Sequence, residues 1–357
     1  MEYIKFRKHC QFEGNMAVLR FGIIGIGNIA AIHATAIENT PDAKLVAIAT
    51  RNPERGQAFA ATHNATYFSD HRTLLTQDNI DAVAICTPHD LHSPMTLDAA
   101  AARKHILLEK PMAITTDDCD SMIAACEQAG VTLGIIFQMR FDPLSRRLKA
   151  LIDAGELGRL LWVSANIIWY RSDEYYRSGP WRGTLAHGGG GVLVNQASHL
   201  IDLMLWLDTP NMPARVTAQM KTLNHQIEVE DGVAAILEYA DTKMGLIQAT
   251  TVAYPGYPEH LEFHGTRGSA MYHKGQGRLE WHLIDPKQDH IEEAPVDSGA
   301  AGPTSSNAAG HIAQYQDFVT AVRNHTAPAI DGREGRKSIQ LIEALYRSAC
   351  AKKSVEV

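Results

Sequence analysis

The link between one short strand and the helix that follows it restricts the fold of this chain more than any other feature. Residues 19–24 form a mostly apolar run, residues 25–30 read G-I-G-N-I-A, and a helix-like stretch continues to residue 38. A G-x-G-x-x-A turn between a strand and a helix is typical of a βαβ unit that binds a dinucleotide. The pattern therefore predicts a parallel α/β unit with a phosphate-binding turn.

Each small residue of the turn has a physical reason. Gly25 permits the tight turn, Gly27 leaves room for a pyrophosphate, and Ala30 lets the helix pack closely on the strand. The first N–H groups of the helix, around Asn28 and Ile29, are expected to face the phosphates. The alternative is a glycine-rich turn without a ligand, and the surrounding βαβ pattern favours the phosphate site.

Strands and helices alternate as far as residue 141. Apolar or β-branched runs at 44–50, 82–86, 106–108 and 132–137 are separated by helix-like stretches at 53–62, 93–103 and 116–129. Alternation of this kind indicates a parallel sheet that is buried on both faces. We therefore expect a doubly wound, Rossmann-like α/β domain at residues 18–141, preceded by an N-terminal extension at residues 1–17.

The rhythm changes after residue 141. A helix-like stretch at 143–155 is followed by strand-like runs at 160–170, 215–223, 232–239, 244–254, 259–264, 269–273 and 277–282. Strands without helices between them predict an α+β domain with a largely antiparallel open sheet at residues 142–357. A loop rich in Gly, Ser and Ala at 298–309 precedes closing helices at 311–324 and 335–351, which can pack back on the first domain. The open face of the sheet is expected to bury itself in a homodimer or homotetramer.

Charge and composition exclude several classes of function. A net charge of −7 over 357 residues argues against a nucleic-acid partner. No apolar run approaches the roughly 20 residues of a membrane span, and the charged first 15 residues do not resemble a secretory signal. Five cysteines without C-x-x-C spacing indicate reduced, mostly buried thiols. We expect a cytoplasmic protein.

The end of the second strand bears on the choice of dinucleotide. Many dinucleotide-binding folds place a carboxylate there to hold the ribose hydroxyls, but this chain has Thr50 and Arg51 instead. Without the carboxylate, Arg51 can accept a 2′-phosphate, which favours NADP(H). A solvated loop arginine is the alternative interpretation, and NAD(H) stays open.

Three further blocks carry a family resemblance. The third strand is followed by T-P-H-D-L-H at 87–92, E-K-P occupies 109–111, and residues 188–202 read G-G-G-G-V-L-V-N-Q-A-S-H-L-I-D. Together with the phosphate turn, these blocks resemble the Gfo/Idh/MocA family, which includes glucose–fructose oxidoreductase and inositol dehydrogenase. The matches run in order along nearly the whole chain. The resemblance implies an NAD(P)-dependent enzyme that transfers a hydride between nicotinamide and a secondary alcohol or ketone of a sugar, a sugar derivative or a cyclitol.

The resemblance also assigns residues. Lys110 corresponds to the lysine that gives or takes the proton beside the nicotinamide, and His199 to the histidine that binds the reacting oxygen. The loop at 87–89 corresponds to a T-P-N-like segment along the cofactor, with His89 where Asn is usual. Asn195 stands where many members carry Asp, so any carboxylate-to-histidine proton relay would lack its carboxylate.

The same residues suit the chemistry on physical grounds. Oxidising a secondary alcohol requires a base for the hydroxyl proton, and a lysine can serve if burial lowers its pKa from about 10.4. Pro111 disfavours helix at Lys110 and keeps it at a strand end. Helical spacing places Asn195, His199 and Asp202 on one face, where Asp202 either orients the imidazole or only supports packing. A surface lysine and a core histidine are the structural alternatives.

The segment 169–184 is dense in aromatic residues and arginines and is punctuated by Gly and Pro, which predicts an ordered loop rather than a helix. Aromatic faces and guanidinium groups suit a polyhydroxylated ring. Packing between domains or subunits is the alternative. The expected substrate-binding residues are Lys110, Tyr170, Arg171, Tyr176, Trp181, Asn195 and His199. The expected cofactor-binding residues are Gly25, Gly27, Asn28, Ile29, Thr50, Arg51, Thr87, Pro88, His89, His92, Glu109, Lys110, Gln138 and Arg182.

No set of His, Cys, Asp or Glu has the spacing of a metal site, so no metal is expected. Arg140, near the end of the last strand of the first domain, is a weaker site candidate by position alone. Two other functions remain open at this point. One is an NAD-dependent glycosidase that oxidises the ring only transiently. The other is a dinucleotide- or sugar-sensing regulator, for which Lys110 and His199 would have no use.

Overall fold

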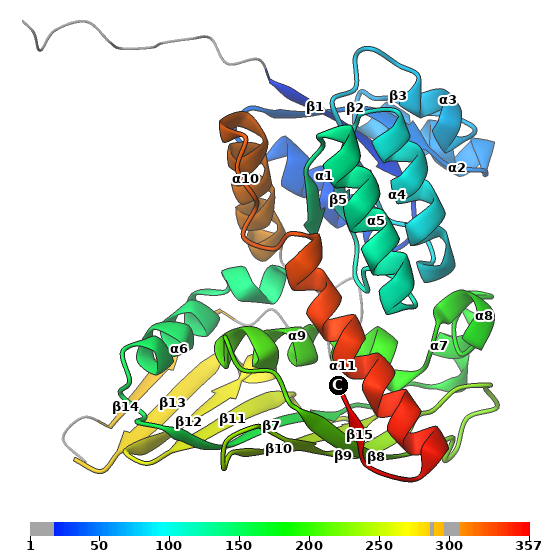
Figure 1. Cartoon of the computed structure of the whole chain (residues 1–357). Helices are drawn as coiled ribbons and strands as arrows, with labels where there is room; N and C mark the ends of the chain where they lie inside the picture. Colours follow the sequence, from blue (N-terminus) through cyan, green and yellow to red (C-terminus); the bar gives the residue numbers. More distant parts are fainter. Residues whose placement is uncertain (1–17, 286–288, 296–307) are drawn as a thin grey trace, which may run out of the picture.

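A parallel six-stranded sheet forms the core of the N-terminal domain in the computed structural model, which describes residues 18–285, 289–295 and 308–357 (Figure 1). The strand order is β3-β2-β1-β4-β5-β6, and all neighbours are parallel. The strands are β1 (Leu19–Ile24), β2 (Ala43–Ala49), β3 (Thr66–Phe68), β4 (Ala82–Ile85), β5 (His105–Leu108) and β6 (Leu133–Ile135). The helices are α1 (Ala30–Glu38), α2 (Pro53–Thr62), α3 (His71–Leu75), α4 (His92–Ala101) and α5 (Thr116–Ala129).

The central strands of this sheet are buried on both faces. Every residue of β4 is buried, as are the last three of β5, which explains why these strands are short continuous apolar runs. The strand order reverses beside β1, whose neighbours β2 and β4 lie on opposite sides. Ligands of open α/β sheets bind at such a switch point, at the carboxyl ends of the strands.

The second sheet has nine strands in the order β14-β13-β12-β11-β7-β10-β9-β8-β15. Neighbouring strands are antiparallel except for β7 and β10. The strands are β7 (Leu160–Ile168), β8 (Arg215–Lys221), β9 (Gly232–Glu238), β10 (Met244–Thr250), β11 (His260–Gly265), β12 (Gly268–His273), β13 (Arg278–Leu283), β14 (His290–Glu293) and β15 (Val355–Glu356). The predicted fold class, a Rossmann-like domain followed by a largely antiparallel α+β domain, is confirmed.

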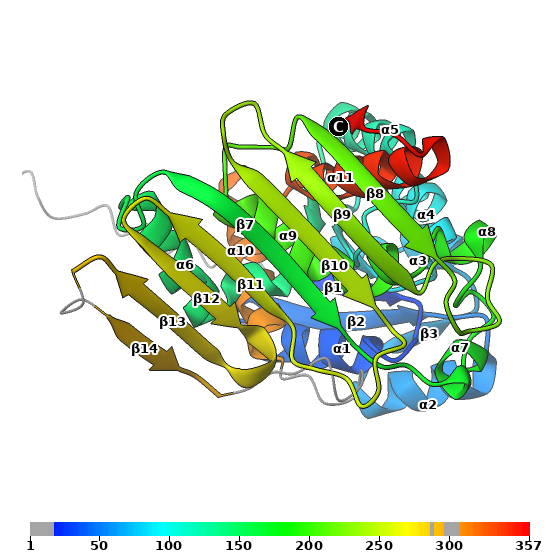
Figure 2. The same cartoon turned by 90° about the horizontal axis from the view of Figure 1, so that it is seen from below.

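The two faces of this sheet differ. Helices α6 (Pro143–Asp153), α9 (Ser198–Leu207) and α11 (Gly332–Ala351) pack on the face that points to the first domain. Among the described residues no helix covers the opposite face, which Figure 2 shows in front. Trp162, Ile236 and Met244 point outward there and are 36%, 44% and 42% exposed. Val163, Leu237 and Ile247 of the same strands point to the other face and are buried.

The C-terminal helices join the two domains. Helix α10 (Ala309–Asn324) packs against α1, and its Tyr315 and Phe318 lie 5.4 and 6.2 Å from the Phe21 ring of β1. Helix α11 contacts α5 and β6 of the first domain as well as α9 and β8 of the second (Figure 1). The end of the chain therefore contributes to the core of the first domain.

Several short elements were not predicted. Strands β3, β14 and β15 and helix α3 have two to five residues, too few for a periodic pattern. The aromatic segment was expected to lack helix, but it contains the short helix α7 (Asp173–Arg177). The expected extension at 1–17 and the loop at 298–309, apart from its last two residues, lie outside the described residues.

Two further expectations concern the whole chain. None of the described helices combines the length and the apolar character needed to cross a membrane. The described cysteines are all free thiols, and Cys86, Cys119 and Cys126 are buried while Cys350 is exposed.

Candidate active site

A cavity of about 1140 Å³ lies between the two domains. One wall comes from the loops at the carboxyl ends of β1, β2, β4 and β5, where a doubly wound sheet binds its ligands. The other wall comes from the segment after β7 and from the start of α9. Most of the predicted site residues line this cavity, although they are spread over more than 170 positions of the sequence.

The phosphate turn faces the cavity as the sequence predicts. Gly25 has φ +93°, and a Cβ there would lie 2.7 Å from the carbonyl oxygen of Cys86. A Cβ on Gly27 would meet nothing closer than 4.0 Å, so the space beside this residue is open. No side chain caps the start of α1 at Ile29. The turn thus leaves room and backbone N–H groups for a pyrophosphate.

The rim beyond the turn is lined by Thr50 and by the exposed Arg51. Two residues that were not predicted join them. Arg55 on α2 donates to the carbonyl of Ile26 at 3.1 Å, and Asp70 follows the short strand β3. Asp70 was missed because three residues of strand carry too little pattern to be recognised.

The loop after β4 is tied to the second domain. Thr87, Pro88 and His89 line the cavity, and Nδ1 of His89 lies 2.8 Å from the carbonyl oxygen of Gly188. The His89 ring packs against Trp181 with its centroid 4.8 Å away and its plane tilted by 57°. Burial and the neighbouring His92 lower the pKa of His89 to about 3, so its ring is neutral.

His92 does not reach the cavity. It is fully buried, and its Nδ1 and Nε2 lie 2.8 and 3.0 Å from the carbonyl oxygens of Pro111 and Thr87. The structure therefore places this predicted cofactor residue behind the site, where it joins the loop after β4 to the loop after β5.

Lys110 reaches into the cavity from the end of β5. Its Nζ donates to the carbonyl oxygen of Asn195 at 2.9 Å. Burial lowers the pKa of Lys110 to about 8. The negative charge of Glu109 opposes this shift, and the positive charge of Arg182 adds to it. A lysine of this kind can exchange a proton near neutral pH, whereas an ordinary solvated lysine stays charged.

Asn195 and His199 are presented by an irregular helix. Residues Leu193–Ala197 form a short π-helical segment, called the π-turn below, which leads directly into α9. Such turns displace backbone groups from the regular ladder and are frequent at functional sites. The backbone carbonyl of Asn195 accepts a hydrogen bond from the Lys110 amine. The side-chain amide of Asn195 donates to the Tyr175 hydroxyl at 2.9 Å.

His199 lines the cavity beside Lys110. Burial, together with the charge of Lys110, holds the pKa of His199 well below 6.5, so the imidazole is neutral. Its Nδ1 is buried and has no hydrogen-bond partner among the described residues; the same is true of Thr87 Oγ1 and Gln138 Oε1. Three orphaned polar atoms in the wall of one cavity fit a site that is completed by a polar ligand.

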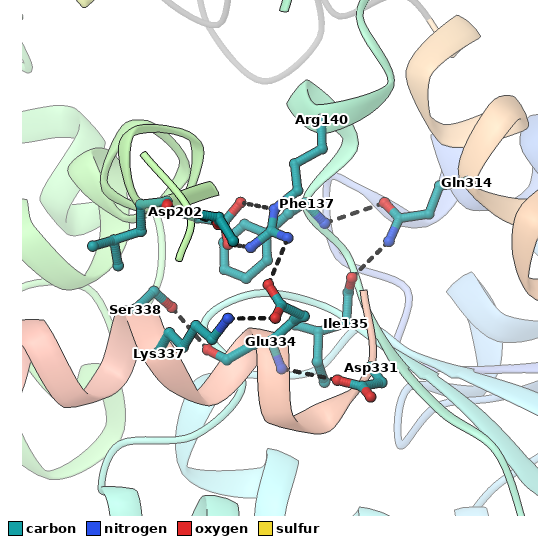
Figure 3. A network of polar contacts seen from close by, with 12 residues as sticks. Ile135, Phe137, Arg140, Asp202, Gln314, Asp331, Glu334, Lys337 and Ser338 are labelled. Carbon is teal, nitrogen blue, oxygen red and sulfur yellow. Dashed lines mark hydrogen bonds and ion pairs between the residues drawn. The ribbon is translucent and has the colours of Figure 1, made fainter. Parts of the chain in front are cut away.

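Asp202 does not orient His199. Its carboxylate accepts from Arg140 at 2.6 and 2.8 Å, and Arg140 also donates to Glu334 of α11 at 3.0 Å (Figure 3). In the same network the side-chain amide of Gln314, on α10, donates a hydrogen bond to the backbone carbonyl of Ile135. Asp202 and Arg140 therefore support the junction of the domains, so Asp202 has the packing role that was the alternative interpretation.

The aromatic segment contributes a different set of side chains from the predicted one. Arg171, Trp181 and Arg182 line the cavity, and so do Trp169 and Tyr175, which were not predicted. The Tyr175 hydroxyl accepts from Arg182, Asn195 and Gln196 at 2.5, 2.9 and 3.1 Å. It thus connects the segment to the π-turn.

Tyr170 and Tyr176 lie outside the cavity. Tyr170 is 37% exposed and packs against Tyr254, with ring centroids 5.2 Å apart. The Tyr176 hydroxyl lies 2.8 Å from Thr251 Oγ1. Because α7 turns by about 100° per residue, Tyr175 and Tyr176 point in different directions, which a loop interpretation could not foresee.

The structure also gathers three buried side chains that sequence spacing did not reveal. His33, Glu109 and His311 offer nitrogen and oxygen atoms within 4.8 Å of one another, a spacing that could hold a metal ion. Both ring nitrogens of His33 are already hydrogen-bonded, to Tyr315 and to Glu109. We therefore interpret the group as a hydrogen-bonded ion pair with a neighbouring histidine.

A Rossmann-like sheet with a phosphate turn, opening on a cavity that contains a buried lysine, is typical of an NAD-binding oxidoreductase. Residues 19–137 match the oxidoreductase family with an NAD-binding Rossmann fold, and residues 145–271 match the GFO/IDH/MocA C-terminal domain. The chain belongs to the Gfo/Idh/MocA family, as its motifs predict, and the prediction of an enzyme of the dehydrogenase and reductase class is confirmed.

Individual relatives agree with this assignment. The chain is 30% identical to the uncharacterized oxidoreductase YrbE of Bacillus subtilis over 70% of its own length and 72% of the relative's. It is 26% identical to inositol 2-dehydrogenase of Rhizobium meliloti, covering 95% and 99% of the two chains. The WlbA dehydrogenase from Bordetella pertussis, solved in complex with NADH and UDP-GlcNAcA, superimposes with a TM-score of 0.85 at 34% identity, covering 96% and 98%.

Proposed function

We propose that the protein transfers a hydride between a nicotinamide cofactor and a secondary alcohol or ketone of a sugar, a sugar derivative or a cyclitol. The observation that carries the proposal is the Lys110 amine, which faces the same cavity as the phosphate turn and His199. Inositol 2-dehydrogenase, and WlbA with its UDP-GlcNAcA ligand, support a polyhydroxylated ring as the substrate.

When it is bound, the nicotinamide supplies the acceptor or donor of the hydride. Neutral Lys110 takes the hydroxyl proton in the oxidation direction, and its ammonium returns the proton to the oxygen in reduction. His199 is neutral and positions the reacting oxygen by a hydrogen bond. Asn195 orients the Lys110 amine through its carbonyl, and we assign its side chain to a substrate hydroxyl.

We favour NADP(H) as the cofactor, with NAD(H) as the alternative. Thr50, Arg51 and Arg55 line the cavity near the end of β2 and could surround a 2′-phosphate. The WlbA dehydrogenase was solved with NADH, which supports NAD(H) as the alternative cofactor. For the substrate we propose Arg171, Trp181 and the newly found Tyr175, with Arg182 facing a cofactor phosphate.

The quaternary structure and the location belong to the same proposal. The face of the second sheet with Trp162, Ile236 and Met244 would be covered by a second copy, in a homodimer or homotetramer. The free thiols of the described cysteines favour the cytoplasm as the place of reaction.

The decisive experiment is a panel of sugars, cyclitols and sugar acids with NAD⁺ and NADP⁺, followed by the absorbance of the reduced cofactor. We expect turnover by the wild type and its loss in Lys110→Ala. Full rate in that variant would contradict the assignment. Glycoside cleavage without accumulation of reduced cofactor would indicate a glycosidase, and cofactor binding without any turnover a sensing regulator.

A further inference from the structure

A chain of buried hydrogen bonds lies directly behind Lys110. His33 of α1 is fully buried, and its Nε2 lies 2.8 Å from Oε1 of Glu109, the residue before Lys110. Its Nδ1 lies 2.7 Å from the Tyr315 hydroxyl of α10. Three elements that are far apart in the sequence thus meet at one imidazole.

The Glu109 carboxylate is held away from the neighbouring amine. Its Oε1 is taken by His33, and its Oε2 accepts from the backbone N–H of Lys110 at 3.1 Å. The Lys110 Nζ instead donates to the Asn195 carbonyl. Among the described residues, no carboxylate oxygen lies within 4.0 Å of that amine.

This arrangement needs an explanation, because a partly buried ammonium gains most from a carboxylate in contact. The same chain shows such a contact elsewhere, where Nζ of Lys243 lies 2.6 Å from both carboxylate oxygens of Asp208. Glu109 follows directly before Lys110, yet its side chain is directed to α1. The residue that retains it there is His33.

We propose that His33 is a positioning residue that clamps the Glu109 carboxylate, so that the Lys110 amine turns to the Asn195 carbonyl and the cavity instead of pairing with Glu109. The inference rests on the proposed function of Lys110 as the acid/base group and adds a residue that acts through another. Tyr315 completes the clamp, which gives the C-terminal helix a part in the site of the first domain.

The charges around the clamp fit this role. Burial opposes a charge on His33, but contacts with Cys86, Tyr315 and Glu109 hold the pKa of His33 well above 6.5. Burial would raise the pKa of Glu109, but His33 brings it down to about 2. Both directions favour a charged His33 beside a charged Glu109. Neutral His311 also faces it, while Arg182, His89 and His199 face Lys110.

The test is the pH at which Lys110 loses its proton. In His33→Leu the released carboxylate swings to the ammonium, and we expect the pKa of Lys110 to rise by about one unit or more. In Glu109→Gln the carboxylate charge is gone, and the pKa of Lys110 falls below the wild-type value. The double variant should behave as Glu109→Gln alone, because His33 has no carboxylate left to hold.

Two readouts keep this test separate from the proposed function. Competitive acetylation at graded pH, followed by mass spectrometry of the Lys110 peptide, reports its protonation without any substrate. The pH profile of turnover reports the same change if the enzyme acts on the panel. Failure of turnover alone would remove the proposed function and leave the clamp testable by acetylation.

A matched control is available in the second domain. His225 and Asp231 form another buried pair, with Nδ1 3.0 Å from Oδ2. His225→Leu should lower stability without moving the Lys110 titration. The proposal is overturned if His33→Leu leaves that titration in place, lowers it, or shifts it no more than the control. If His33→Leu does not fold, an unchanged titration in Glu109→Gln overturns the proposal as well.

Discussion

Lys110 and Lys243, two lysines of the described residues whose amines are withdrawn from solvent, differ in the group that their amine contacts. Lys243, just before β10, is 2% exposed; its amine is gripped by both oxygens of Asp208 and lies 4.0 Å from the centre of the Tyr239 ring. Lys110 is partly buried at the end of β5 and donates to a backbone carbonyl at the edge of the cavity.

The difference decides what each amine can do. Removing an ammonium from water disfavours its charge, and a carboxylate in contact offsets that cost. For Lys243 the carboxylate fixes the position of the amine, which suits a structural role. For Lys110 the offset is incomplete, and burial leaves the pKa at about 8. In the proposed function, the absence of a carboxylate in contact is what would allow Lys110 to act as an acid/base group.

Among the variants that test this comparison of Lys110 with Lys243, we expect the largest loss of activity in Lys110→Arg. The guanidinium keeps the charge but cannot give up its proton, so we expect kcat/KM to fall by about 10²- to 10⁴-fold. Lys243→Arg is the matched control, because arginine also pairs with a carboxylate. It should retain turnover per folded molecule. Retained turnover in Lys110→Arg would show that Lys110 acts through its charge alone, and equal losses in the two variants would show that the loss does not come from the missing proton transfer.

Stability should respond in the opposite way. Lys243→Met leaves the Asp208 carboxylate buried without its cation, and we expect the free energy of unfolding to drop by about 3–5 kcal/mol. Lys110→Met leaves no carboxylate unpaired and should cost much less. Denaturant unfolding of both variants measures the difference. Lys243→Met/Asp208→Leu should recover most of the loss, and no recovery would contradict the ion-pair explanation.

The sequence could predict the fold because each element of the first domain has a local signal. Strand β1 and helices α2 and α5 fall at their predicted residues, and the turn at Gly25 and Gly27 has the expected conformation. The family blocks likewise place Lys110 and His199 in one cavity. These signals are local in the chain or belong to the family motifs, so they can be recognised from the sequence alone.

The rest depends on contacts between distant segments. Nothing near His33 in the sequence indicates that it meets Glu109 and Tyr315, which follow 76 and 282 residues later. The choice of Tyr175 over Tyr176 depends on a five-residue helix with no periodic pattern. Asp202 has the spacing of a partner for His199, but Arg140 from the domain junction takes its carboxylate.

The pH dependence of turnover sharpens the comparison further. Oxidation needs neutral Lys110, so kcat/KM should fall about tenfold per pH unit below the pKa of about 8. Reduction needs the ammonium, so its rate should decline as the pH rises through the same value. Initial rates in both directions between pH 6 and about 10 provide the measurement. Limbs with the same sign in both directions would exclude Lys110 as the shared acid/base group.

An exposed cation extends the comparison to a third case and should give the smallest effect. Arg51 lies at the cavity rim in open solvent, so its charge matters only when a phosphate binds beside it. We expect Arg51→Ala to raise the KM for NADP⁺ about tenfold while leaving that for NAD⁺ nearly unchanged. The control is Arg333→Ala, because Arg333 is an exposed arginine of α11 that pairs with Glu127. Equal losses for both cofactors would remove the preference for NADP(H) and assign Arg51 to a contact that the two dinucleotides share.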